Sequence, residues 1–117
     1  VHKWALVERD PFPKWGDGRI TLMGDACHPM TPYMAQGAAM SIEDAAILSR
    51  CLDGVGRDGV VAGLRRYEES RMARTARIQT ISRLNDMNKI KAEINNTYGY
   101  DAWSAPLAEE TTGVAAE

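Results

Sequence analysis

The chain has 117 residues and a mass of 12.9 kDa, enough for one small domain but too few for a dinucleotide-binding domain and a substrate domain together. Its content of 44% hydrophobic and 26% charged residues excludes collagen-like, disulfide-scaffold and wholly disordered classes. A net charge of -2 and a pI near 5.7 give no overall attraction to nucleic acid or to anionic lipid, so neither is an expected partner.

The cysteine content and the absence of a targeting pattern bear on the compartment. Cys27 and Cys51 lie far apart and form no CxxC motif, so we expect neither a disulfide framework nor a metal site. No apolar run reaches the roughly 20 residues of a membrane-spanning helix, and the N-terminus lacks the apolar core of a signal peptide. We therefore expect a cytoplasmic protein, and the missing initiator Met suggests a chain that begins within a longer one.

The first half of the chain predicts a strand, a proline loop and a helix. Residues 3–7 suit a short strand, followed by a surface loop rich in proline and glycine. Residues 19–24 form a short apolar run with β-branched residues, which is typical of a buried strand in a parallel sheet. Pro29 and Pro32 forbid a regular helix, and a helical pattern begins at Gly37. The apolar positions of that pattern are Ala38, Ile42, Ala45, Ala46, Cys51 and Leu52.

The second half predicts a longer amphipathic helix that starts near Val60 and carries arginines on its other faces. Its apolar positions are Leu64, Tyr67, Ile78, Ile81 and Leu84. Beyond Asn85 the pattern weakens, and residues 95–97 and Gly99 suggest breaks. Residues 104–117 are small and acidic, so we expect a flexible tail.

Residues 24–45 carry the features that point to chemistry. Asp25 follows the predicted strand at the edge where α/β sheets bind ligands, and its carboxylate can accept hydrogen bonds from a polyol. Gly24 allows a ligand to approach the backbone. Small residues around Gly37 leave backbone N–H groups free at a helix start, where the dipole favours negative charge. A reduced flavin is negative at N1 and the C2 carbonyl, so this helix start would suit it.

The sequence GDACHP at 24–29, then TP at 31–32 and QGAAMSIEDA at 36–45, resembles the second FAD fingerprint of the flavin-dependent aromatic hydroxylases. This family includes the p-hydroxybenzoate and salicylate hydroxylases. The specific likeness covers residues 19–53, and Tyr67-Glu68 with Arg71 and Arg74 extends a weaker one. The flanking sequences KWALVERDP and YGYDAW look most like the 6-hydroxynicotinate 3-monooxygenase and salicylate hydroxylase branch.

The resemblance implies an α/β fold, namely the C-terminal part of a Rossmann-like FAD-binding fold. Residues 1–18 would return from the substrate domain, 19–53 would bind FAD, and 57–103 would form a C-terminal helical region. Asp25 would bind the ribityl hydroxyls and Pro32 would lie beside the reactive edge of the isoalloxazine. The backbone at the pyrimidine end would come from Gly37, Ala38 and Ala39.

The implied activity is that of a monooxygenase in the breakdown of aromatic compounds. NAD(P)H would reduce FAD, and O₂ would then react at the flavin and transfer an OH to an aromatic or pyridine carboxylic acid. The chain has no GxGxxG for the ADP half, so it would act only with the remainder of the enzyme, and a homodimer is left open. Tyr33 stands where the salicylate branch often has His, and Ala35 and Ala39 stand where Gly and Asn are common.

Several residues have alternative interpretations. Cys27-His28 could form a nucleophile or a metal pair, but adjacent side chains diverge and the sequence predicts no orienting carboxylate, so we expect a packing role. Glu43-Asp44 is expected to complement a helix dipole rather than to act as a general acid and base. If the substrate needs a general base, the candidates are Tyr33 and His28.

The arginines of the second helix stand among Glu68 and Glu69, which favours a solvated face or an interface with the rest of the enzyme over a phosphate track. They are Arg65, Arg66, Arg71, Arg74, Arg77 and Arg83. One alternative function is a related FAD-dependent epoxidase, halogenase or reductase, because these share the fingerprint. The other is a non-catalytic helical interaction module, which would need neither Asp25 nor Gly37.

Overall fold

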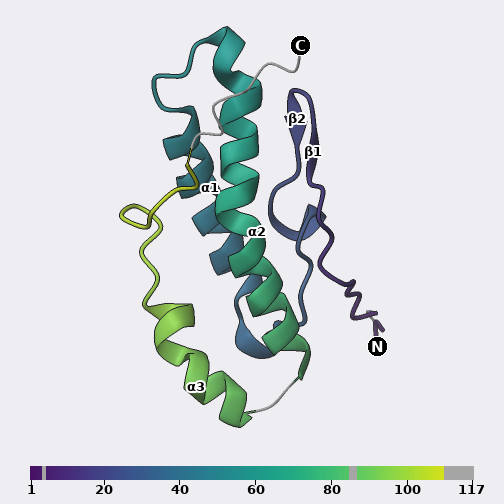
Figure 1. The fold of residues 1–117 in the computed structure, drawn as a ribbon. Coiled ribbons are helices and arrows are strands. Elements are labelled where there is room, and N and C mark those ends of the chain that lie inside the picture. The colour runs from purple at the N-terminus through teal and green to yellow at the C-terminus, as the bar shows by residue number, and fades with distance from the viewer. Residues whose placement is uncertain (4, 85–86, 110–117) are drawn as a thin grey trace.

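The computed structural model describes residues 1–3, 5–84 and 87–109, and its centre is a pair of packed helices (Figure 1). Helix α1 spans Gly37–Leu52 and helix α2 spans Val60–Leu84, with the short turn η3, Arg57–Gly59, between them. Helix α3, Met87–Tyr98, extends from one end of the pair. Within the described ranges, no helix is both long and apolar enough to cross a membrane.

A two-stranded hairpin lies beside α2 (Figure 1). Strand β1, Gly16–Asp17, pairs antiparallel with β2, Ile20–Thr21, and Gly18 supplies the positive φ of 57° that the tight turn requires. The fold is α/β as expected, but of the parallel strand predicted at 19–24 only β2 forms here, and within this chain it pairs antiparallel. The turn at Gly18 brings β1 next to β2, and the described residues contain no other strand that could pair with it. Residues 5–7 form no strand either, and Trp4 lies outside the described residues.

The helix predicted from Gly37 is confirmed at its start, and its predicted apolar positions Ala46 and Cys51 are buried, but others are not. The short 3-10 turn η2, Pro32–Met34, replaces a regular helix between the prolines and α1. Ala38, Ile42 and Ala45 are exposed, with Ile42 at 71%. The helix carries apolar residues on more than one side. Its buried residues are Met40, Asp44, Ala46, Ile47 and Cys51, and α2 is the helix that packs against it.

The core lies between α1, α2 and the hairpin. Helices α1 and α2 approach closely at Gly63, where an added Cβ would lie 2.9 Å from the backbone oxygen of Cys51. As predicted, Leu64, Tyr67 and Ile78 are buried. The contiguous core consists of Trp15, Cys27, Ala46, Ile47, Cys51, Tyr67 and Ala102.

The chain after α2 is held against the helix pair. Helix α3 continues through residues 95–97, where breaks were predicted, and Arg74 donates hydrogen bonds to the carbonyls of Asn96 and Thr97 near its end. Further on, the N–H of Ala108 donates to Oγ of Ser70 in α2 at 2.9 Å. The predicted flexible tail, residues 104–117, therefore contacts α2 at Ala108. Residues 110–117 lie outside the described residues.

Candidate functional site

The turn after the hairpin and the start of α1 form one surface. Gly24 begins the 3-10 turn η1, Gly24–Ala26, with a φ of 63°, and an added Cβ there would lie 2.8 Å from Oγ of Ser41. Asp25 follows on the exposed side, and its Oδ1 lies 3.7 Å from the position that a Cβ would take at Gly37. The structure therefore brings Asp25 and the start of α1 together, as the sequence predicted.

The N-terminus of α1 is open. Gln36 occupies the N-cap position, and its side chain makes no capping hydrogen bond. Ala38 is exposed, and Gly37 and Ala39 are half-buried. The free N–H groups of such a helix start, together with its dipole, favour an anionic group or a carbonyl oxygen. A ligand that combines hydroxyl groups with a partial negative charge would fit between this helix start and Asp25.

Hydrogen bonds to residues of α2 hold the loop that precedes α1. Thr31 donates from Oγ1 to the backbone oxygen of Ser82 at 2.8 Å, and Ser82 donates from Oγ to the backbone oxygen of Thr31 at 2.6 Å. Gln79 donates from Nε2 to the carbonyl of Pro29 at 2.9 Å. Because Gln79 and Ser82 are buried, these hydrogen bonds hold the loop in one place while Pro32 faces solvent.

The end of this loop is held by α3 and has an unusual backbone. The hydroxyl of Tyr98 donates to the carbonyl of Met34 at 3.1 Å. Ala35 then takes a φ of 51°, the left-handed region in which glycine is unstrained. Tyr33, proposed from the sequence as a weak catalytic candidate, is 53% exposed on this loop.

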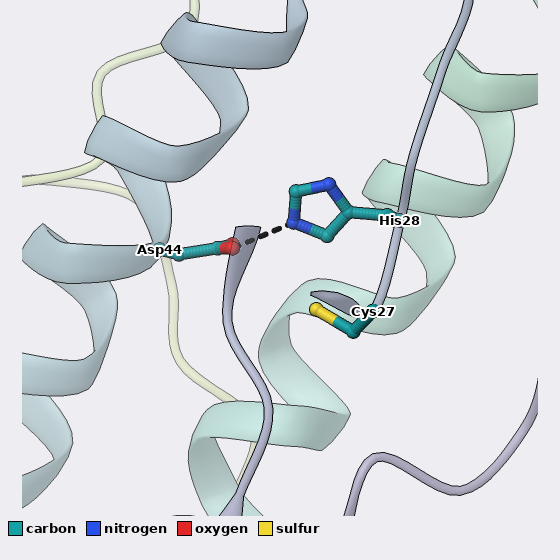
Figure 2. Close-up of side chains that lie close together, drawn as sticks. All are labelled: Cys27, His28 and Asp44. Atoms are coloured by element: carbon teal, nitrogen blue, oxygen red, sulfur yellow. Dashed lines mark hydrogen bonds and ion pairs between the residues drawn. The ribbon is translucent and has the colours of Figure 1, made fainter. Parts of the chain in front are cut away.

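Beneath the turn, Asp44 is the centre of a buried polar network (Figure 2). Its Oδ2 lies 2.6 Å from Nε2 of His28 and 3.0 Å from the backbone nitrogen of Gly24. Its Oδ1 accepts a hydrogen bond of 2.7 Å from Nε of Arg71. All three side chains are at most 1% exposed. A single carboxylate on α1 thus binds both ends of the turn that carries Asp25.

Charge complementarity keeps this network ionised. Burial alone would raise the pKa of Asp44, but the hydrogen bonds from His28, Arg71 and Gly24 hold that pKa below its ordinary value. Burial opposes the charge of Arg71 as well, yet its bonds to Asp44 and Glu43 raise the pKa of Arg71 above the ordinary value. The pair is therefore ionised throughout the neutral range.

Cys27 belongs to the same cluster, and its thiol is buried there. Its sulfur, an imidazole nitrogen of His28 and a carboxylate oxygen of Asp44 lie within 4.8 Å of one another, an arrangement that could in principle hold a metal ion (Figure 2). The thiol instead donates to the carbonyl of Gly24 at 3.3 Å, and burial and the charge of Asp44 raise its pKa to about 12. A protonated thiol and a carboxylate already bound by Arg71 are poor ligands, so the arrangement is that of a hydrogen-bond network.

Two sequence-based interpretations need correction here. The expectation that no carboxylate orients Cys27-His28 is wrong, because Asp44 lies 2.6 Å from His28. The dipole explanation for Glu43-Asp44 is also wrong, because α1 begins at Gly37 and its first turn contains no acidic residue. Both carboxylates instead bind arginines of α2.

The arginines of α2 do not form one solvated face. Arg71 is fully buried, and Arg74 donates to both carboxylate oxygens of Glu43 at 2.8 Å while its guanidinium lies 3.7 Å from the ring centroid of Tyr100. Arg77 is exposed, as expected. The signal for a buried arginine was its spacing, since Arg71 lies one helical turn from the buried Tyr67 and Thr75.

A cavity of about 300 Å³ borders His28. Its walls include Phe12, Trp15, Met72 and Gln79 together with Cys27 and His28. Nε2 of His28 already binds Asp44, and Nδ1 has no hydrogen-bond partner within the described ranges. His28, the second catalytic candidate from the sequence, therefore lies under the turn, whereas Tyr33 lies on the exposed loop.

An exposed carboxylate, Asp25, thus lies beside the uncapped start of α1, and buried hydrogen bonds to Asp44 hold the turn that carries it. The profile of the FAD binding domain family matches residues 5–82, two thirds of the chain, and the chain belongs to this family. The match includes the whole of the turn, the proline loop and α1.

The chain is similar to known flavin-dependent enzymes. It is 49% identical, over 93% of its length, to 6-hydroxynicotinate 3-monooxygenase of Bordetella bronchiseptica. It is 56% identical, over 69% of its length, to 3-hydroxybenzoate 6-hydroxylase 1 of Aquipseudomonas alcaligenes. The alignments cover 28% and 20% of these relatives, so the chain spans less than a third of their length.

Solved structures show the same fold. The structure of CtdE in complex with FAD superposes with a TM-score of 0.72 at 30% identity, over 84% of this chain and 24% of CtdE. FqzB superposes with a TM-score of 0.73 at 29% identity, over 85% of this chain and 27% of FqzB. The turn, proline loop and helix pair therefore follow an architecture that occurs in a protein solved with FAD.

Proposed function

We propose that this chain is the part of an FAD-dependent monooxygenase that binds the ribityl chain and the isoalloxazine. The complete enzyme would hydroxylate an aromatic or pyridine carboxylic acid with NAD(P)H and O₂. The observation that carries the proposal is the position of the Asp25 carboxylate beside the open start of α1, within the segment that matches the FAD binding domain family. The names of the similar enzymes support the substrate class.

Each residue of the site has a distinct role in this proposal. Asp25 accepts hydrogen bonds from ribityl hydroxyls, and its exposure leaves both carboxylate oxygens available. Gly37, Ala38 and Ala39 present backbone N–H groups to the pyrimidine end of the ring, where the helix dipole stabilises negative charge. Pro32 packs beside the ring and excludes water from it.

FAD, when bound, supplies the redox and oxygen chemistry, and the residues of this chain bind and orient it. The buried hydrogen bonds of Gln79 and Ser82 keep the proline loop in place, which limits the motion of Pro32 relative to α1. Of the two candidate proton acceptors, Tyr33 is next to Pro32 and exposed, whereas Nε2 of His28 is already bound to Asp44. Tyr33 is therefore the better-placed candidate for contact with a substrate.

The test uses the complete gene product that contains these residues, purified as the parent and as Asp25→Ala. We expect the parent to show the visible absorbance of bound flavin and the variant to bind FAD about tenfold or more weakly, since a charge-assisted hydrogen bond is lost. Asp17→Ala is the matched control, because Asp17 is also an exposed aspartate but lies in β1, away from the turn.

The outcomes separate the proposed function from the interaction module. A parent without bound flavin, even after incubation with FAD, would contradict the proposal and favour a module that docks a partner protein. A parent that binds FAD and oxidises NAD(P)H in response to hydroxylated aromatic or pyridine acids would support it. Product analysis then separates hydroxylation from epoxidation, halogenation or reduction. A cytoplasmic location and a homodimer stay predictions.

A further inference from the structure

We infer that Asp44 is a positioning residue for flavin binding: its buried carboxylate fixes the turn from Gly24 to His28 against α1, so that Asp25 stays beside Gly37. This inference rests on the proposed function of Asp25. It assigns a role to a residue that cannot touch the cofactor, since the Asp44 side chain is fully buried beneath the turn.

The first argument is geometric. Asp44 accepts from the backbone N–H of Gly24, directly before Asp25, and from Nε2 of His28, shortly after it. The carbonyl of Gly24 in turn accepts from the backbone nitrogens of Cys27 and His28, both at 3.0 Å. The turn is therefore closed on itself, and both of its ends are attached to one carboxylate.

The second argument concerns α1. Asp44 lies about two helical turns after Gly37 on the same rigid element. A displacement of the Asp25 turn relative to the helix start would have to break a hydrogen bond to Asp44 or bend α1. The distance between the Asp25 carboxylate and the open helix start is therefore set by Asp44 rather than by a flexible loop.

The third argument is the orientation of the carboxylate itself. Arg71 binds Oδ1 at 2.7 Å and so leaves Oδ2 directed at the turn. Arg71 also donates from its Nη1 to Glu43 at 2.8 Å, a separate bond that involves neither Oδ2 of Asp44 nor the turn. A buried ion pair is weak evidence for stability, because well-packed apolar residues often serve as well. An ionised acceptor with fixed geometry is needed here because the buried N–H of Gly24 and His28 both require one.

The experiment compares Asp44→Asn with Glu43→Gln in the complete gene product. Glu43 neighbours Asp44 and also pairs with Arg71, but among the described residues it makes no hydrogen bond or ion pair with the turn, so it controls for the loss of an arginine partner. FAD affinity is measured by titration of the apoprotein, and stability by urea unfolding of the same preparations. We expect the dissociation constant to rise about tenfold or more for Asp44→Asn and to stay within about twofold for Glu43→Gln.

A second pair of variants tests the hydrogen bond between His28 and Asp44 independently, so that the inference can still be tested if Asp44→Asn does not fold. His28→Gln can place an amide N–H near the position of the imidazole Nε2, whereas His28→Leu cannot donate. We expect FAD affinity close to that of the parent for His28→Gln and a loss of about tenfold for His28→Leu. Equal FAD affinities for these two variants would overturn the role of this hydrogen bond.

The results distinguish this inference from the proposed function. If the parent binds FAD and Asp25→Ala loses it, but Asp44→Asn keeps the affinity of the parent while its urea midpoint falls, then Asp44 is only structural and the inference is wrong. If the parent binds no FAD, the proposed function is wrong and the inference falls with it. Loss of affinity in both Asp25→Ala and Asp44→Asn, with Glu43→Gln unaffected, supports both.

Discussion

Arg71 donates from Nε to Oδ1 of Asp44 across 2.7 Å, and neither side chain is exposed to solvent. The two residues join α2 to α1 and so connect the longest helix to the helix that begins at the candidate site. Both charges are removed from water, which costs free energy. The main effect of the pairing is that each charge offsets the desolvation cost of the other.

Removal of one partner should therefore lower the stability of the folded protein. We expect Arg71→Met to lower the free energy of unfolding by about 3–5 kcal/mol, because Asp44 would be left as a buried charge without its arginine partner. Urea unfolding of the complete gene product measures this. Arg77→Met is the control, since Arg77 is 57% exposed in its pair with Glu93 and should cost less than about 1 kcal/mol. Similar losses in the two variants would contradict the argument.

The depressed pKa of Asp44 predicts a loss of stability in acid. Its folded-state pKa lies below the ordinary value of 3.8, so its contribution is complete above that value and is lost as the pH falls through the folded-state pKa. We expect the urea midpoint of the parent to fall more steeply than that of Asp44→Asn between about pH 5 and about pH 2. Parallel curves for the two proteins would show that Asp44 does not carry this pH dependence.

The raised pKa of Cys27 predicts an unreactive thiol. With a pKa of about 12 instead of the ordinary 9.0, and with a buried side chain, Cys27 should resist alkylation in the native protein at neutral pH. Peptide mass spectrometry after iodoacetamide treatment assigns the label to Cys27 or to Cys51, and urea-unfolded protein provides the positive control. Rapid native labelling of Cys27 would contradict the burial described above.

Ala35 is the place where a single added glycine should stabilise the protein. Its φ of 51° places a Cβ in the left-handed region, so Ala35→Gly should raise the free energy of unfolding by about 1 kcal/mol. The control is Ala73→Gly in the middle of α2, where the same change should lower it by about 0.5–1 kcal/mol. Thermal unfolding distinguishes the two signs, and a loss at Ala35 would contradict the strain.

Gly63 is the place where an added methyl group should destabilise the protein. A Cβ there would lie 2.8 Å from Cδ2 of Leu52 and 2.9 Å from the backbone oxygen of Cys51, so Gly63→Ala should cost about 1–3 kcal/mol by forcing α1 and α2 apart. Gly56→Ala is the control, because Gly56 has a φ of -71° and an added Cβ there would have no neighbour within 4 Å. The same unfolding measurements apply, and equal stabilities would mean that the helices adjust without cost.

Local patterns predicted the helices and the candidate site better than they predicted the pairing partners. The helix start at Gly37 and the long helix from Val60 were predictable because prolines, glycines and apolar spacing act over a few residues. The motif also placed Asp25 next to Gly37. The antiparallel pairing of β2 was missed, because a run of six residues does not reveal which segment it pairs with.

The buried network was missed for a related reason. An arginine among other charged residues of a helix is normally solvated, and only the tertiary structure shows that Arg71 meets Asp44, 27 residues earlier in the chain. The choice between the apolar faces of α1 was also undetermined by periodicity, since both faces carry apolar residues and only the position of α2 decides between them.

The anchoring of the proline loop has a consequence for the order of folding. The hydrogen bonds from Gln79 to Pro29 and from Ser82 to Thr31 join residues 50 and 51 positions apart, and that from Tyr98 to Met34 spans 64 positions. Contacts so distant in sequence form after local helix formation, because the chain between them must first be ordered. The surface proposed to receive the flavin would thus be completed late, and a nascent chain would acquire it only after α2 and α3 had been synthesised.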